Sequence, residues 1–187
     1  MTPGIALVTG ASKGIGAACA LALSRAGHRV ALVSRDEEAL EQVADALPGE
    51  SLVVPADMLD PAAIDAAFSR VEEEWGPVEI LVVNAGAATS APLVRTSDED
   101  WQRMLDLNLT APFRCLRRAL PPMTSAGVGR VVVIASIAGK AGSARIAAYT
   151  ASKHGVLGLV RVAAAEVAKS GVTVNAVCPG YVDTPMT

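Results

Sequence analysis

The fold of this chain is decided by a stretch near its N-terminus, Ile5-Ala6-Leu7-Val8-Thr9-Gly10-Ala11-Ser12-Lys13-Gly14-Ile15-Gly16. Residues 5–8 form a short apolar run that predicts a buried strand, and residues 17–26 predict a helix that Gly27 ends. Between them, glycines let a ligand approach the backbone, and the free N–H groups of the helix N-terminus attract an anion. A tight structural loop is the alternative. Because the turn lies between a first strand and a first helix, it predicts dinucleotide binding.

Short apolar runs alternate with amphipathic stretches along the whole chain. This alternation predicts an α/β fold, a Rossmann-like doubly wound parallel sheet with helices on both faces. We expect strands at Ile5–Val8, Val30–Val33, Leu52–Val54, Ile80–Val83, Val131–Ala135 and Val172–Val177. We expect helices near Ile15–Ala26, Glu37–Leu47, Pro61–Glu74, Trp101–Ala126 and Tyr149–Lys169. No repeat or linker interrupts the pattern, so residues 1–187 are expected to form one domain.

Composition excludes several classes of function. Hydrophobic residues make up 51% of the chain and aromatic residues only 3%, which suits a sheet buried on both faces. The net charge of −3 gives no electrostatic reason to expect nucleic acid or an anionic membrane as a partner. The chain shows no signal peptide and no apolar run of membrane-spanning length, so we expect a cytoplasmic protein.

Metal binding and disulfides are not expected either. The three cysteines, Cys19, Cys115 and Cys178, are far apart and form no Cys-x-x-Cys pair, which favours buried thiols in a reducing compartment. With only His28 and His154 beside them, a zinc site has too few candidate ligands.

A polar residue follows most of the predicted strands at the point where the apolar run ends. In an open parallel sheet, ligands bind beyond the carboxyl ends of the strands. Any one such residue could merely start a turn, but several in register favour a site at this edge. The residues are Thr9, Ser34, Asp57, Asn84 and Ser136.

A second signal lies in Ala148-Tyr149-Thr150-Ala151-Ser152-Lys153. In a helix, the spacing of four residues places Tyr149 and Lys153 on one face, one turn apart. An ammonium beside a phenol favours the phenolate, which makes Tyr149 a candidate general acid. The alternative is a solvated helix face, since this spacing is common by chance.

Taken together, these motifs resemble the short-chain dehydrogenase/reductase family in order and spacing along essentially the whole chain. The glycines follow the pattern Gly-x-x-x-Gly-x-Gly rather than the dinucleotide fingerprint Gly-x-Gly-x-x-Gly. The runs Tyr149–Leu159 and Val174–Pro185 look most like ketoreductases that act on 3-oxoacyl thioesters or polyketides. The motifs that carry the resemblance are Thr9–Gly16, Asn84-Ala85-Gly86, Asn108, Ser136, Tyr149-x-x-x-Lys153 and Pro179-Gly180.

The residue after the second strand indicates which cofactor to expect. An Asp or Glu there would favour NAD, but this chain has Val33-Ser34-Arg35. The guanidinium of Arg35 suits a 2′-phosphate, and Lys13 adds a second cation, so we expect NADP(H). The alternative is that Arg35 pairs with Asp36 or Glu37 on the surface.

The resemblance also implies a set of cofactor-binding residues. Asp57 would contact the adenine ring, Asn84-Ala85-Gly86 would lie along the cofactor, and Thr184 would bind near the nicotinamide amide. Asn84 could equally brace neighbouring strands. The full set is Gly10, Ser12, Lys13, Gly14, Ile15, Gly16, Arg35, Asp57, Asn84, Ala85, Gly86, Tyr149, Lys153, Pro179, Gly180 and Thr184.

Four residues are expected to carry the chemistry. Ser136 would orient a substrate carbonyl, Tyr149 would give it a proton, and Lys153 would assist Tyr149 and hold the nicotinamide ribose. Asn108 resembles the residue that bends the long helix and anchors a water in a proton relay; an Asn in mid-helix conflicts with local propensity. The alternatives are a strand-ending turn for Ser136 and a satisfied polar residue in a kink for Asn108.

The sequence ends at Pro185-Met186-Thr187. Members of the family usually continue with a helical segment, one more strand and a glycine-rich loop, so we expect an unfinished substrate pocket and an unpaired sheet edge. By resemblance, a dimer or tetramer would pair the long helices that carry Asn108 and Tyr149.

Several functions therefore stay open. The first is an NADPH-dependent reductase of 3-oxoacyl thioesters or polyketides, with small secondary alcohols or steroids as other substrates. The second is a non-catalytic NADP-binding or oligomerising module. A sugar epimerase is a weaker third reading, because its Gly-x-x-Gly-x-x-Gly spacing is not what Gly10, Gly14 and Gly16 show.

Overall fold

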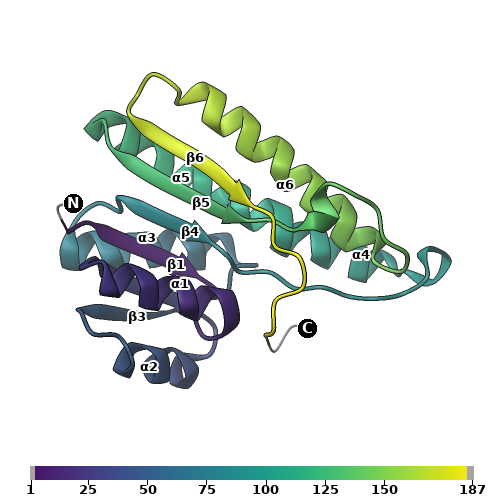
Figure 1. Cartoon of the computed structure of the whole chain (residues 1–187), viewed down its shortest axis with the longest axis horizontal. Coiled ribbons are helices and arrows are strands. Elements are labelled where there is room, and N and C mark those ends of the chain that lie inside the picture. The colour runs from purple at the N-terminus through teal and green to yellow at the C-terminus, as the bar shows by residue number, and fades with distance from the viewer. Residues whose placement is uncertain (1–2, 185–187) are drawn as a thin grey trace.

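The computed structural model describes residues 3–184, which contain one six-stranded parallel sheet (Figure 1). The strand order is β3-β2-β1-β4-β5-β6, so the order reverses beside β1, as in doubly wound folds. The predicted strands are confirmed to within two residues at each end. Their bounds are β1 Ile5–Thr9, β2 Arg29–Ser34, β3 Ser51–Pro55, β4 Ile80–Val83, β5 Gly129–Ile134 and β6 Val172–Val177.

Helices cover both faces of this sheet (Figure 1). On one face, α1 and α2 pack over a cluster that includes Val8, Leu32 and Leu40; on the other, α3, α5 and α6 pack over a larger cluster around Phe68 and Leu81. No helix within residues 3–184 is both long and apolar enough to cross a membrane. The α-helices are α1 Gly14–Arg25, α2 Glu37–Asp45, α3 Pro61–Trp75, α4 Asp98–Leu105, α5 Ala111–Ala126 and α6 Ala147–Glu166, and the short 3-10 turns are η1 Leu93–Arg95 and η3 Ile137–Gly139.

The single helix expected over Trp101–Ala126 is wrong in one respect. The structure interrupts it with a π-helical turn, η2 (Asp106–Thr110), between α4 and α5. The N–H of Ala111 donates to the carbonyl of Asp106, five residues back. Pro112 has no N–H with which to bond the carbonyl of Asn108, so the α-helical ladder is broken there as well. Tertiary contacts of Asn108, described below, favour this widened turn.

Strand β6 lies at the edge of the sheet and pairs only with β5, as expected. Its side chains alternate, with Val172 and Val174 buried and Thr173, Asn175 and Val177 exposed. Within residues 3–184, therefore, α6 covers one face of β6 and no helix covers the other (Figure 1). Residues 185–187, where we expect the sequence to stop short of its relatives, lie outside the described residues.

Candidate active site

A cleft of about 680 Å³ runs along the carboxyl ends of the strands. It is lined by residues that follow all six strands, from the glycine turn after β1 to Pro179 and Gly180 after β6. The edge at which we expect a ligand is therefore the edge that the cleft occupies. Every residue predicted to bind cofactor or to act in catalysis lines this cleft, except Gly16.

The glycine turn owes its shape to backbone conformations and close approaches that side chains would prevent. Gly10 and Gly14 have φ of +64° and +57°, which residues with a Cβ rarely adopt. A Cβ on Gly16 would lie 2.1 Å from the carbonyl oxygen of Gly10, so Gly16 lets the first turn of α1 pack directly on the loop. Gly16 thus packs against the turn on the side away from the cleft, while Gly10 and Gly14 line the cleft.

Thr9 and Asn84 fasten this turn to the neighbouring strand. The Thr9 hydroxyl accepts the N–H groups of Asn84 (2.9 Å) and Ala85 (3.1 Å). The Asn84 amide donates to the carbonyls of Thr9 (3.1 Å) and Gly10 (3.0 Å). Thr9 is buried and does not line the cleft, so its expected place among the polar groups that face a ligand is wrong. Asn84 lines the cleft but also braces the strands, as the alternative reading held.

We expect Asn84→Ala to lower the free energy of unfolding by about 1–3 kcal/mol, because the Thr9 and Gly10 carbonyls lose their shared donor. Thermal unfolding of the apo protein measures this change. Asn175→Ala is the control, since Asn175 is exposed on β6 and its loss should cost less than about 0.5 kcal/mol. Equal midpoints for the two variants would show that the Asn84 side chain does not hold the turn.

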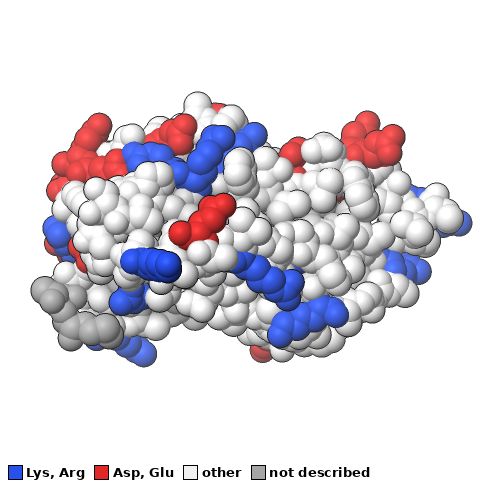
Figure 2. All heavy atoms as spheres, turned by 90° about the horizontal axis from the view of Figure 1, so that it is seen from above, with Lys and Arg blue, Asp and Glu red and all other residues white. Residues whose placement is uncertain are grey.

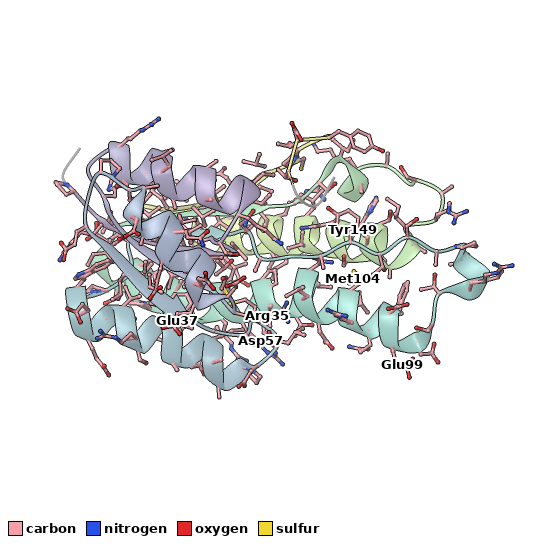
Figure 3. The ribbon with its side chains drawn as sticks, turned by 90° about the horizontal axis from the view of Figure 1, so that it is seen from below. Arg35, Glu37, Asp57, Glu99, Met104 and Tyr149 are labelled. Atoms are coloured by element: carbon pink, nitrogen blue, oxygen red, sulfur yellow. The ribbon has the colours of Figure 1, made fainter. Side chains whose placement is uncertain are left out.

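Arg35 and Asp57 follow neighbouring strands, β2 and β3, and lie side by side at one end of the cleft (Figure 3). Arg35 Nη1 lies 4.0 Å from Asp57 Oδ2, and the Arg35 side chain is 68% exposed. This loose pair replaces the expected alternative of a pair with Asp36 or Glu37. Asp57 also accepts the N–H of Leu59 (2.9 Å), which fixes the loop after β3. The Arg35 guanidinium is thus placed at the cleft without a tight carboxylate partner.

Tyr149 and Lys153 lie in the first two turns of α6, at the other end of the cleft from Arg35 (Figure 3). Lys153 Nζ lies 5.7 Å from the centroid of the Tyr149 ring and donates to the carbonyl of Ile134, at the end of β5 (2.9 Å). Lys153 is only 6% exposed, and burial lowers the pKa of its ammonium from 10.5 to about 8. The helix therefore brings a buried cation against a half-buried phenol, as the spacing predicts.

Ser136 lies directly after β5 and also lines the cleft. Its hydroxyl accepts the N–H of Ala138 (3.1 Å) at the start of η3, so the strand-ending turn of the alternative reading is present. A hydroxyl that accepts one N–H still has a proton to donate. The Ser136 hydroxyl can therefore accept the hydrogen bond of the turn and donate one to a ligand at the same time.

Asn108 lies in the π-helical turn and is fully buried. Its side-chain oxygen accepts the N–H of Ala87 (3.1 Å), and its amide donates to the carbonyl of Ala87 (2.9 Å) and contacts the sulfur of Met104 (3.6 Å). These contacts make it a satisfied polar residue in an interrupted helix. They also hold the segment after β4, where Gly86 passes close to both Asn108 and Lys153 Nζ.

The segment after β6 folds back over the glycine turn (Figure 1). Thr184 lies so near Gly14 that a Cβ on Gly14 would be 3.3 Å from the Thr184 side chain. The carbonyl of Pro179 accepts the N–H of Ile137 (3.0 Å), which ties this segment to the loop after Ser136. The segment after β6 thus meets the glycine turn after β1 at the cleft.

Some residues of the cleft gave no signal in the sequence. Met58 and Leu59 follow Asp57, and Leu107 and Arg103 come from η2 and α4. Ala87 is linked to Asn108 through its backbone, which no side-chain pattern records. Arg103 is a single cation on an amphipathic helix, and its spacing of four residues from Leu107 is the only hint that it shares the cleft face.

The cleft fits a phosphate-bearing dinucleotide. Its middle is the N-terminus of α1, where the first N–H groups have no partner within the helix and Gly10 and Gly14 keep the backbone accessible. It is lined by four cations, Lys13, Arg35, Arg103 and Lys153, against two carboxylates, Asp36 and Asp57. The remaining surface is largely apolar, as the planar rings of a dinucleotide require.

Comparison with known proteins matches the chain to dehydrogenases and reductases. The family model described as short chain dehydrogenase matches residues 4–187. The chain is 42% identical to 3-oxoacyl-[acyl-carrier-protein] reductase MabA of Mycobacterium tuberculosis, over 97% of this chain and 70% of that protein. It is 41% identical to D-beta-hydroxybutyrate dehydrogenase of Rhizobium meliloti, over 97% and 72%.

A solved structure matches equally well. A crystal structure of a variant of actinorhodin polyketide ketoreductase with NADPH superimposes with a TM-score of 0.96 and 41% sequence identity. The alignment covers 98% of this chain and 72% of that one.

Proposed function

Because the chain belongs to the short chain dehydrogenase family, we propose that it is an NADPH-dependent ketoreductase that reduces a 3-oxoacyl thioester or a polyketide ketone to a secondary alcohol. The observation that carries this proposal is the buried Lys153 against the ring of Tyr149, in the same cleft as the glycine turn and Ser136. A plain nucleotide-binding module has no need of this costly buried cation.

The glycine turn and the N-terminus of α1 would hold the pyrophosphate of NADPH, and Arg35 with Lys13 its 2′-phosphate. Asp57 would lie by the adenosine, and Asn84, Ala85 and Gly86 along the middle of the cofactor. Lys153 is proposed to bind the nicotinamide ribose. Pro179, Gly180 and Thr184 would close over the nicotinamide end.

The bound NADPH supplies a hydride, and the protein supplies position and a proton. Ser136 Oγ donates a hydrogen bond to the substrate carbonyl and so orients it. Tyr149 Oη gives its proton to the same carbonyl oxygen as negative charge develops there. The Lys153 ammonium beside the ring favours the resulting phenolate, which lowers the cost of that transfer. Asn108 positions Ala87 and the segment around Gly86.

The substrate class rests on the relatives. The two matched enzymes and the ketoreductase of known structure are named for 3-oxoacyl, 3-hydroxy acid and polyketide substrates. In each class of compound the reacting carbon carries oxygen close to a carboxyl or thioester carbonyl. We propose the same chemical class here, with small cyclic ketones as comparison substrates.

The proposal is tested by titrating the 187-residue chain with NADPH and with NADH, and then by assaying NADPH oxidation with a ketone panel. We expect tighter binding of NADPH, and turnover that is fastest with a 3-oxoacyl thioester. Binding of NADPH with no turnover on any ketone would favour the non-catalytic module instead. Binding of neither cofactor would refute the proposal.

Arg35→Ala should raise the Kd for NADPH about 10- to 100-fold and leave the Kd for NADH unchanged, because only NADPH carries the 2′-phosphate. Fluorescence titration of both cofactors measures the two constants. Arg25→Ala removes an exposed cation at the far end of α1 and serves as the control. An equal loss for NADPH and NADH would mean that Arg35 does not select between them.

We also propose a homodimer or homotetramer that pairs α5 and α6 with their counterparts. Phe113 on α5 and Val162 on α6 are exposed apolar side chains, at 42% and 56%. Figure 2, which shows the molecule from the side on which α6 lies, has a largely uncharged area in the middle of its right half, with charged side chains around the edge of that area. Light scattering of the purified chain tests the proposal, and a monomer at micromolar concentration would contradict it.

A reducing compartment such as the cytoplasm suits the three cysteines, all of which are free thiols. Burial raises the pKa of Cys19, and it raises the pKa of Cys115 to about 12, so neither thiol is activated.

A further inference from the structure

Arg103 is the one cation among the cleft residues that has no part in the proposed function. It lies on α4, is exposed, and lines the cleft together with Leu107, which follows it by one helical turn. Among residues 3–184 its guanidinium has no ion pair and no hydrogen-bond partner, although Asp106 lies three residues away and is bonded by Gln102 (2.9 Å). A cation left unpaired at the wall of a ligand cleft points to a ligand group as its partner.

The position of this wall identifies the part of the cofactor. In doubly wound folds the pyrophosphate lies at the first helix N-terminus and the residue after the second strand meets the ribose. The base then lies beyond it, at the end of β3, where Met58 and Leu59 line the cleft. The helical segment that carries Arg103 and Leu107 continues into α5, whose Arg114 donates to the carbonyl of Leu59 (3.4 Å). The start of α5 therefore lies beside the loop after β3, and Arg103 and Leu107 line the same cleft as that loop.

The chemistry of this part of the cleft suits a base better than a phosphate. Leu107, Met58 and Leu59 are apolar and line the cleft, so together they would form an apolar slot for a flat ring. A guanidinium is planar and weakly hydrated, and it stacks on aromatic faces. The 2′-phosphate already has Arg35 and Lys13 close to the end of β2 and the glycine turn.

We propose that Arg103 binds the adenine ring of the cofactor, stacking its guanidinium over the base against the apolar slot of Leu107, Met58 and Leu59. This inference rests on the proposed function, since it assumes that the cleft takes NADPH. Because NADPH and NADH both contain adenine, Arg103 on α4 would then strengthen the binding of both cofactors equally.

The test uses Arg103→Gln, which removes the charge and keeps much of the side-chain length, and Arg103→Lys, which keeps the charge without the planar group. The ligands are NADPH, NADH and 2′,5′-ADP, all of which contain adenine. For Arg103→Gln we expect Kd to rise about 3- to 30-fold, by the same factor for all three ligands. Arg103→Lys should fall between that variant and the wild type. Arg95→Gln removes an exposed cation outside the cleft and should bind like the wild type.

Four outcomes would overturn the assignment. An unchanged Kd for Arg103→Gln would remove the contact altogether. A loss limited to NADPH and 2′,5′-ADP would make Arg103 a phosphate ligand, and a loss for NADPH and NADH but not 2′,5′-ADP would place it at the nicotinamide end. Failure of the wild type to bind any of the three ligands would refute the proposed function, and this inference with it. The first outcome, obtained with a wild type that binds all three ligands, would refute this inference and leave the proposed function standing.

Discussion

Tyr149→Phe is expected to lower turnover about 10²- to 10⁴-fold, because it deletes the hydroxyl that gives a proton to the carbonyl oxygen. The ring remains, so its packing and the 5.7 Å approach of Lys153 Nζ remain. NADPH binding should therefore change little, and the loss should appear in kcat. Steady-state assays with a 3-oxoacyl thioester, together with a cofactor titration, separate the two effects.

The chain supplies its own control for this variant. Its second tyrosine, Tyr181, is 97% exposed, and it does not line the cleft. Tyr181→Phe makes the same chemical change and should leave kcat unchanged. Turnover of Tyr149→Phe within a few-fold of the wild type would contradict the assignment of Tyr149 as the proton donor.

Lys153→Met is expected to have two opposite effects: loss of turnover and a gain in the stability of the apo protein. Removal of the ammonium takes away the charge that favours the Tyr149 phenolate, so we expect a loss of about 10²- to 10⁴-fold. Burial, however, lowers the pKa of Lys153 from 10.5 to about 8, which at neutral pH corresponds to about 3 kcal/mol of destabilisation. After the lost hydrogen bond to Ile134 is allowed for, we expect a net gain of about 1–3 kcal/mol at pH 7.

The sign of the pH dependence follows from the direction of the shift. Below pH 8 Lys153 is charged in the folded and the unfolded chain, and the folded state bears the full cost of burying the charge. Between about pH 8 and 10.5 the unfolded state binds more protons than the folded state, so the stability of the wild type rises. The advantage of Lys153→Met should therefore shrink across this window.

Chemical denaturation at pH 7 and at pH 10 measures this difference. Because other groups titrate in the same range, the quantity of interest is the difference between variant and wild type. Lys169→Met, which removes an exposed lysine just after α6, is the control and should show no such dependence. An apo Lys153→Met protein that is less stable than the wild type at pH 7 would contradict the account of a costly buried cation.

The parts of the site that are local in sequence were predictable. The glycine turn depends on residues 9–16 and on the strand and helix that flank them. Tyr149 and Lys153 share one helix, so their spacing alone fixes their relation. Both predictions of placement are confirmed by the structure, because each needs only local geometry to be right.

Features that depend on tertiary contacts were missed. A bend at Asn108 was expected by resemblance, but its π-helical form and its bonds to Ala87, 21 residues away in the chain, were not. Thr9 was expected among the polar groups that face a ligand. Its buried hydroxyl instead accepts the N–H groups of Asn84 and Ala85, which directly follow β4. Residue types and their spacing do not determine which strand becomes the neighbour of which.

Arg35 illustrates the same limit. Its neighbours in sequence, Asp36 and Glu37, were its partners in the alternative interpretation, whereas the structure places Asp57 beside it. The cause is the sheet, because β2 and β3 are adjacent and parallel, with Ser34 paired to Pro55, so the residues that follow them come together. Once the strand order is known, this pair is predictable; from the sequence alone it is not.

The most direct test of the account measures the stoichiometry of the reaction on the wild-type chain. With NADPH in excess, loss of NADPH absorbance and formation of the alcohol are followed together after a 3-oxoacyl thioester is added. We predict one NADPH oxidised for each secondary alcohol formed, with a rate lowered by Tyr149→Phe and not by Tyr181→Phe. Bound NADPH that is never oxidised, by this or any ketone supplied, would contradict the claim that the cleft is a ketoreductase active site.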